Sequence, residues 1–454
     1  MSATLDRRPA APAVPIAQPA EIGRFVWWCF ATLILFCAIY FHSKTDPGIR
    51  FAVKHSGLTN YGPSWWTQQK FGQFTPGDVA VIAFAYVGLI ERLRSGRMAI
   101  SSRMAWLLGL GTTAVLMGVA AGIYHETQSP FGDWRDLAVG VLYAFALWST
   151  VIRTDRDCFR FAQIFVAILV VYGAWQLVQY ASGGGEIAFY GRTTVGDHAT
   201  LEFMVAAVGV SMAMLRTHRS RSLWMAGIAV GTAVVVLAFR RYAWVELATV
   251  FAAFILFSGV NRRRYLVSIA GLAAVCLITV GLTWSSLDWG GRLASLDPTQ
   301  TRAENVYATT NQGHINDILD GFDEVKAHPI TGLGVGVLYQ PRRTAQWKGQ
   351  AGMVHNAPVE VWIKFGLLGL GVFLAVYVIL FRDIWRRRNR GRVCDLLAFG
   401  GGAFLLGNAV VIGTVYSWPF GAPEKAILIF TLIAMAYPPG WRQSPPARAT
   451  APQS

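Results

Sequence analysis

Long apolar runs constrain this chain more than any other feature of its sequence. The core of a bilayer is spanned by roughly 20 apolar residues in a helix. Backbone groups cannot stay unpaired in hydrocarbon, so runs of this length must be helical. Several of the runs reach this length, and the sequence therefore predicts an all-α polytopic membrane protein with about twelve transmembrane helices. The runs lie near residues 24–42, 77–92, 104–124, 137–152, 159–181, 199–215, 223–239, 242–260, 265–285, 357–381, 393–415 and 423–437.

The composition agrees with a surface that faces lipid. Of the 454 residues, 54% are hydrophobic and only 14% are charged, whereas a soluble globular protein carries about 25% charged residues. The net charge of +15 would suggest a nucleic-acid partner for a soluble protein. In a membrane protein, topology explains it better, because cytoplasmic loops collect Lys and Arg. We therefore expect membrane lipids and no nucleic acid as partners.

The basic residues predict the orientation of the chain. Nineteen of the 40 Lys and Arg residues lie in five short connections, and every second connection is rich in Arg. This alternation predicts an even number of helices with both termini in the cytoplasm. The Arg-rich connections are 92–103, 153–160, 216–221, 261–264 and 382–392.

Two features interrupt this regular pattern. The termini are rich in Ala and Pro, which is typical of disorder. About seventy residues separate helices nine and ten on the outer side, and loops of that length are usually functional. This loop contains an amphipathic stretch at Ile315–Ala327 and is expected to be partly helical. The expected organisation is a disordered cytoplasmic N-terminus at 1–22, helices 1–9 at 23–285, an outer loop at 286–356, helices 10–12 at 357–437 and a disordered cytoplasmic tail at 438–454.

Neither a disulfide nor a metal site is expected. Four of the five cysteines lie in or beside apolar runs, and Cys158 lies in a basic connection. None has metal-ligand spacing. The outer loops contain no Asp-x-Asp pair and no His-x-x-x-His or His-Glu-x-x-His pattern. We therefore expect a metal-independent mechanism without a cofactor.

The end of the large loop carries the most specific motif. His-Pro-Ile-Thr-Gly-Leu-Gly-Val-Gly occupies 328–336, His355-Asn356 enters helix ten, and Gly366 and Gly369 follow within that helix. This pattern resembles the O-antigen ligase family, whose members attach O-polysaccharide to the lipopolysaccharide core. The resemblance extends over most of the chain: twelve helices, a large late outer loop, a Pro-x-x-Gly-x-Gly turn and the closing His-Asn motif.

The resemblance implies a GT-C-like membrane glycosyltransferase of the bacterial inner membrane with a periplasmic active site. The donor would be O-antigen on undecaprenyl pyrophosphate, and the acceptor a sugar hydroxyl of lipid A-core. Related O-antigen polymerases and protein O-oligosaccharyltransferases share the pattern less strictly. From another class, a transporter of the same lipid is the alternative. A transporter should show broken helices in two related halves, and none are evident. The sequence does not indicate an oligomeric state.

Arginines are the expected partners of the pyrophosphate. Arg is always charged and offers a planar fork to phosphate oxygens, and groups that stabilise developing charge lower the barrier. By the resemblance, Arg241 takes the position of a functional Arg, with Arg240 where the family has Ser. Arg192 fits a second family Arg before helix six. A third family Arg is replaced by His314, and Arg302 is a candidate substitute.

The His-Asn motif supplies the expected base. A sugar hydroxyl loses its proton as it attacks, and His is suited to accept that proton near neutral pH. We expect His355 to be the general base of a one-step, inverting transfer. Asn356 is equally consistent with a helix cap and with a substrate contact.

Structural roles compete with several of these assignments. Arg240 and Arg241 are also explained as an interfacial turn. Gly366 and Gly369 suit helix packing, and the glycines at 332, 334 and 336 suit a turn. Glu202 and Glu246 are expected to pair with the arginines, Lys425 with the adjacent Glu424, and Lys364 has no assigned role.

Overall fold

The computed structural model describes the helical part of the chain and short pieces of the connections. The described residues are 21–40, 75–95, 102–127, 132–182, 186–187, 193–195, 198–217, 219–238, 240–257, 263, 265–267, 269–270, 306–338, 343, 354, 356–388, 390–412 and 423–438.

Helices dominate the described part of the chain. They are α1 (Glu21–Tyr40), α4 (Pro76–Ser95), α5 (Ser102–Tyr124), α6 (Gly132–Thr150), α7 (Asp155–Ala181), α8 (His198–Met214), α9 (Arg221–Leu237), α10 (Arg241–Phe257), α13 (Val306–Ala327), α14 (Ala357–Arg387), α15 (Val393–Ile412) and α16 (Pro423–Ala436). A 3-10 turn, Leu215–Thr217, extends α8. Between α7 and α8, β1 (Glu186–Ile187) pairs antiparallel with β2 (Thr193–Thr194), and Glu186 lies opposite Thr194.

The chain is an all-α multi-pass membrane protein. Four described helices are long and apolar enough to cross a membrane: Asp155–Ala181, Thr200–Thr217, Ala357–Arg387 and Val393–Val411. Six further apolar helices are shorter. Each of the expected apolar runs overlaps one of these helices or α4, except the run at 265–285, which lies almost entirely outside the described residues. The total of twelve crossings stays a prediction.

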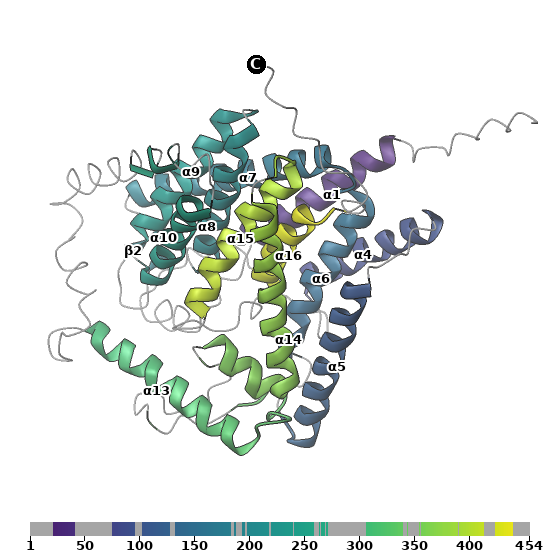
Figure 1. Cartoon of the computed structure of the whole chain (residues 1–454), viewed down its shortest axis with the longest axis vertical. Helices are drawn as coiled ribbons and strands as arrows, with labels where there is room; N and C mark the ends of the chain where they lie inside the picture. Colours follow the sequence, from purple (N-terminus) through teal and green to yellow (C-terminus); the bar gives the residue numbers. More distant parts are fainter. Residues whose placement is uncertain are drawn as a thin grey trace, which may run out of the picture.

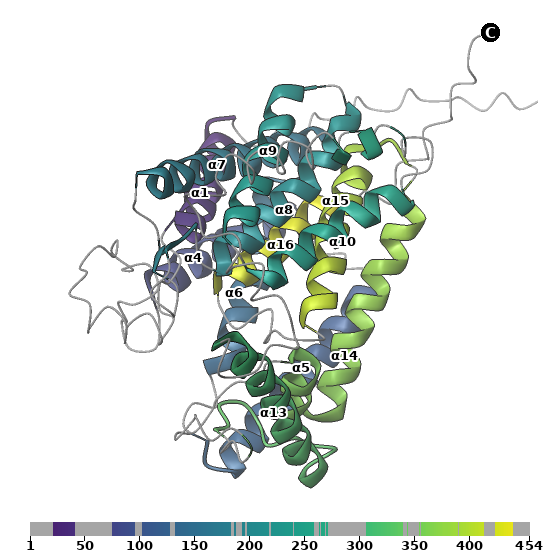
Figure 2. The ribbon, with the colours of Figure 1, turned by 90° about the vertical axis from the view of Figure 1, so that its left-hand side faces the viewer.

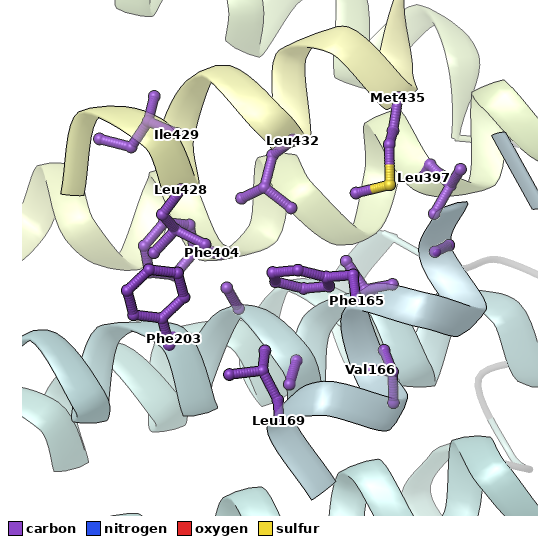
Figure 3. Packing of buried hydrophobic residues seen from close by; sticks show 14 of the residues in the cluster. Phe165, Val166, Leu169, Phe203, Leu397, Phe404, Leu428, Ile429, Leu432 and Met435 are labelled. Atoms are coloured by element: carbon purple, nitrogen blue, oxygen red, sulfur yellow. The ribbon is translucent and has the colours of Figure 1, made fainter. Parts of the chain in front are cut away.

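Helix α8 forms the centre of the bundle. Nearly all of its residues are buried, and it packs against α7, α9, α10 and α15. Its small residues allow close approach: a Cβ on Gly209 would lie only 2.6 Å from the carbonyl oxygen of Gly400 in α15. Figure 3 shows the adjoining apolar core, where Phe203 lies among side chains of α7, α15 and α16. Close van der Waals packing of this kind drives helix association in lipid.

Charged residues at one end of the bundle connect helices that are distant in sequence. Arg24 of α1 binds Asp157 of α7 at 2.5 Å, and Arg387 at the end of α14 pairs with Asp395 of α15. These residues belong to the Arg-rich ends that the sequence assigns to the cytoplasm. The structure therefore gathers them on one face, which we call the arginine-rich face.

Cys158 lies in a helix, contrary to the expectation of a basic connection. It is buried in the first turn of α7. The helix begins early because Thr154 and Asp157 form a reciprocal capping box, which satisfies two of the free backbone donors at a helix start. The apolar run does not indicate this start of α7, because the run begins only after the polar first turn of the helix.

Helices α13, α5 and the first part of α14 form a separate layer. Figure 1 shows α13 lying across one end of the molecule, beside the lower ends of α14 and α5. Figure 2 shows the same arrangement from the side, with the long second part of α14 rising toward the bundle. Helix α13 confirms the helix expected around Ile315–Ala327 and extends it to Val306.

Candidate active site

Asn356 begins helix α14. Its backbone is extended, and its side-chain oxygen accepts a hydrogen bond of 3.1 Å from the backbone nitrogen of Val359. This is the standard geometry of a helix N-cap. The preceding Val354 is buried against α13 with Val325 and Ile363. The entry to α14 is therefore held on both sides of His355, which itself lies outside the described residues.

The glycine motif forms the expected turn. Gly332, Gly334 and Gly336 all have positive φ, at 67°, 95° and 77°, a region that residues with a Cβ rarely adopt. The amide of Leu333 donates to the carbonyl of Ile363 at 2.7 Å. A Cβ on Gly332 would collide with that same carbonyl. The glycines therefore allow the backbone of the turn to lie directly on α14.

Gly366 interrupts α14 instead of serving as a packing residue within a continuous helix. Its φ of 65° and ψ of −169° are non-helical, so α14 consists of two helical parts that meet at this residue. The amide of Leu367, just after the break, donates to Ile330 of the glycine turn at 3.0 Å. The sequence suggested packing within a continuous helix, and that prediction was wrong at Gly366. The spacing of glycines in an apolar run does not reveal a break, because the backbone groups freed by the break form hydrogen bonds with another segment of the chain.

The other side of the turn is bound by α5. The amide of Val335 donates to Gly118 at 3.0 Å, and the hydroxyl of Thr127 donates to the carbonyl of Val335 at 2.7 Å. A Cβ on Gly122 would lie 2.6 Å from that carbonyl. His125 also contacts the ring of His328, with 5.1 Å between ring centroids. The turn is thus fixed between α5 and the broken start of α14.

An ion-pair clamp attaches α13 to the segment that follows the turn. Arg343 binds Asp320 at 3.0 Å and Asp323 at 2.6 Å. Hydrogen bonds from Lys326 and Arg343 lower the pKa of Asp323 from its ordinary value of 3.8. This clamp joins the segment at Arg343 to the side of α13 that carries the two aspartates.

A second group of residues surrounds the turn between α9 and α10. The indole nitrogen of Trp244 donates to the carbonyl of Val235 at 3.0 Å and so closes this hairpin. Arg240 occupies the turn and is partly buried. Its Nε is buried without a hydrogen-bond partner among the described residues. A guanidinium with a free buried donor is suited to bind an anion.

A buried polar cluster lies just beyond this turn. Glu246 of α10 is completely buried, and its Oε1 accepts a hydrogen bond of 3.2 Å from Asn408 of α15. Lys425 of α16 binds Glu202 of α8 at 2.8 Å. The sequence suggested that these glutamates pair with arginines and that Lys425 pairs with Glu424. The structure instead pairs Glu202 with Lys425, because α8 and α16 bring the two side chains together. Ionisable groups at membrane depth are functional candidates by default.

Lys364 also has a partner that the sequence did not identify. It binds Glu360, one turn earlier in α14, at 2.6 Å, and both side chains are buried. The spacing of four residues is the usual helical signal for such a pair. The sequence itself therefore contains the signal for this pair.

Among the described residues, the structure shows no contact between any two of the sequence-predicted site residues. Asn356 and Arg240 are described in full, and they belong to different groups of contacts. Arg241 is the first residue of α10 and His314 lies in α13, but their side chains are not described. Outside the described residues lie His355, Arg192 and Arg302. Arg192 directly precedes β2 in sequence.

One comparison with known proteins decides the family. Residues 226–374 match the family model described as O-antigen ligase. These residues form an O-antigen ligase family domain. The expected resemblance is thereby confirmed, and the matched segment extends from α9 to the second part of α14. No curated protein matches the chain.

The O-antigen ligase domain contains both described groups of site residues. The matched residues 226–374 include the turn between α9 and α10 with Arg240, the buried Glu246, the glycine turn and the Asn356 cap. Arg192 precedes the match, as does the part of α5 that binds the turn. Among the described residues, no group of three or more His, Cys, Asp or Glu side chains could hold a metal ion.

Proposed function

We propose that this protein is an O-antigen ligase. It transfers O-polysaccharide from undecaprenyl pyrophosphate to a sugar hydroxyl of lipid A-core, at the periplasmic face of the bacterial inner membrane. The observation that carries this proposal is the glycine turn inserted at the break in α14. Backbone hydrogen bonds from Leu333 to Ile363 and from Leu367 to Ile330 join the turn to α14 on either side of its break, and one from Val335 to Gly118 joins the turn to α5. The His-Asn motif stands directly at the start of this fixed helix.

Precise fixation at this point suits a general base. A catalytic group must be held within a fraction of an ångström of its productive position, by neighbours that are themselves fixed. In our proposal the acceptor hydroxyl attacks the anomeric carbon as a ring nitrogen of His355 takes its proton. The bond from that carbon to the pyrophosphate oxygen breaks in the same step. Attack opposite the leaving group inverts the configuration at carbon.

Arginines neutralise the leaving group in this mechanism. The pyrophosphate gains negative charge as the bond breaks, and guanidinium groups stabilise that charge in the transition state. The free buried Nε of Arg240 supports this role for the α9–α10 turn. We assign Arg241 and Arg192 to the same task, with Arg302 and His314 as further contacts to the donor. No metal ion or cofactor is required in this scheme.

Related activities remain alternatives within the same superfamily. An O-antigen polymerase would use a growing glycan as acceptor, and a protein O-oligosaccharyltransferase would use a protein hydroxyl. A transporter for the same lipid would need broken helices in two corresponding halves. Among the described helices, only α14 carries a non-helical residue in its interior. This asymmetry favours an enzyme.

Complementation tests the proposal directly. The wild type is expressed in a Gram-negative strain that lacks its own ligase and makes a matching core acceptor. The readout is the lipopolysaccharide ladder, with protein amounts measured in the membrane. We expect the wild type to restore long chains, and His355→Ala, Arg241→Ala and Arg192→Ala to abolish or strongly reduce them. Gly371→Ala is the matched control, because a Cβ there meets open space in the same helix.

The alternatives give different outcomes. Failure in the ligase strain, together with restored chain growth in a polymerase-deficient strain, would replace the ligase by a polymerase. Normal ladders from His355→Ala would remove the proposed base.

A further inference from the structure

A groove opens at the arginine-rich face, away from the α5–α13–α14 layer. It is a shallow groove between α10, α14 and α15 that is open to the surroundings. Its lining residues are Ala253, Phe257, Phe381, Trp385, Arg388, Phe399, Gly402, Ala403 and Leu406.

The body of the groove is apolar and its floor is made of small residues. Gly402 and Ala403 of α15 and Ala253 of α10 leave the space, while Phe257 and Trp385 contact each other as a wall, with 5.0 Å between their ring centroids. Phe381 and Trp385 are each 43% exposed, so the groove opens to the surroundings of the bundle.

One arginine, Arg388, lines the polar end of the groove, and a second, Arg216, lies behind its lining residue Phe399. The guanidinium of Arg388 stacks on Trp385, with 3.9 Å between its central carbon and the ring centroid, and donates to the carbonyl of that residue at 2.6 Å. No carboxylate of the described residues pairs with Arg388. The guanidinium of Arg216 lies 5.4 Å from the ring of Phe399, and its Nη2 is buried without a hydrogen-bond partner in the described part of the chain.

The position of these arginines is fixed by the fold. Arg216 donates to the backbone carbonyl of Arg388 at 3.0 Å and to the hydroxyl of Tyr265 at 2.9 Å. Arg216 therefore holds the backbone at Arg388, and the guanidinium of Arg388 lies at the end of the apolar groove. Positive charge at one end and apolar surface along the rest complement a molecule with an anionic head and a hydrocarbon chain.

We propose that this groove binds an acidic phospholipid. One acyl chain lies over Gly402 and Ala403, between Phe381 and Phe257, and the phosphate accepts hydrogen bonds from Arg388. Basic pockets between transmembrane helices on the cytoplasmic side are known to bind anionic head groups in this way. This site is separate from the proposed transfer site, and its occupant is a lipid of the surrounding bilayer, not the glycan donor.

Native mass spectrometry of the full-length protein tests the proposal. The detergent-purified protein is titrated with phosphatidylglycerol and, separately, with phosphatidylcholine of identical acyl chains. We expect preferential retention of phosphatidylglycerol. Each arginine near a charged lipid surface contributes about 1 kcal/mol, so Arg388→Ala should weaken phosphatidylglycerol binding about five-fold. The loss for phosphatidylcholine should be smaller, because its choline already balances the charge of the phosphate.

Two further variants separate the head-group contact from the groove. Arg382→Ala removes an exposed arginine from the same helix outside the groove and should leave both lipids unaffected. Ala403→Leu fills the floor and should weaken retention of both. If that variant does not fold, Trp385→Ala removes the exposed wall instead. Equal binding of the two lipids by the wild type, or equal losses for Arg388→Ala and Arg382→Ala, would overturn the proposal.

Discussion

The backbone nitrogen of Leu367 in α14 donates a 3.0 Å hydrogen bond to the carbonyl oxygen of Ile330 in the glycine turn. A continuous helix would have used that nitrogen internally. The positive φ of Gly366 frees it, and the turn replaces the lost helical bond. Two segments more than thirty residues apart thus share one backbone network, and the His-Asn motif lies at its edge.

Gly366→Ala should disrupt this network. A Cβ at Gly366 would collide with the carbonyl oxygen of Ile330, and its φ of +65° disfavours any side chain. Backbone strain alone costs about 1–3 kcal/mol, and the collision adds to it. We expect a lower Tm in detergent and a weak or absent lipopolysaccharide ladder. Gly371→Ala, in open space on the same helix, should keep or slightly raise the Tm. Equal behaviour of the two variants would show that the break is not required.

Asn356 variants distinguish a helix cap from a substrate contact. Asn356→Ala removes the acceptor for Val359 and should lower stability by about 0.5–2 kcal/mol. Asn356→Asp keeps an acceptor oxygen and should keep the Tm. If the amide only caps the helix, the Asp variant should also keep its activity. A stable but inactive Asp variant would instead show that the amide nitrogen serves the substrate or the base. The measurements are the Tm in detergent and the lipopolysaccharide ladder.

Lys425 should be essential for the stability of the bundle. Its ammonium lies 2.8 Å from Glu202, and both side chains are buried. Lys425→Met leaves the carboxylate of Glu202 without this cation, and breaking a buried pair costs about 3–5 kcal/mol. We expect a large loss of folded protein in the membrane fraction. The double variant Glu202→Gln/Lys425→Met should recover most of it. A double variant as unstable as the single one would show that the lysine contributes through other contacts.

The stability that the Arg343 clamp gives to α13 should depend on pH in the range below the ordinary pKa of an aspartate. The pKa of Asp323 is lowered in the folded protein by hydrogen bonds from Lys326 and Arg343. The contribution of Asp323 to the free energy of unfolding is therefore present above pH 3.8, and it is lost as the pH falls through the lowered pKa of Asp323. We expect Asp323→Asn to have a lower Tm than the wild type at pH 6, and the difference to shrink toward pH 3. Glu126→Gln, at an exposed position, is the control. A difference that grew on acidification would contradict the assignment.

Much of the architecture could be predicted from the sequence. Apolar length predicted most of the helices, because lipid leaves the backbone no other regular structure in single segments. The motif from His328 to Gly369 indicated the family, which the match over 226–374 confirmed. Turn chemistry was also predictable at Gly332 and Gly334, where glycines cluster after a proline. Helix starts were harder, because at Cys158 the capping residues are polar and precede the apolar run.

The sequence by itself determined the class of protein, the outline of its helices and the family of the segment from α9 to α14. These properties depend on local composition and on short motifs. Only the tertiary structure decided that Gly366 breaks α14, that the glycine turn joins α14 to α5, and that Lys425 pairs with Glu202. Each of these depends on a backbone or side-chain partner far away in the sequence. A hydrogen-bonding group in an apolar run shows only that a partner is needed, and the packing of the other helices decides which residue provides it.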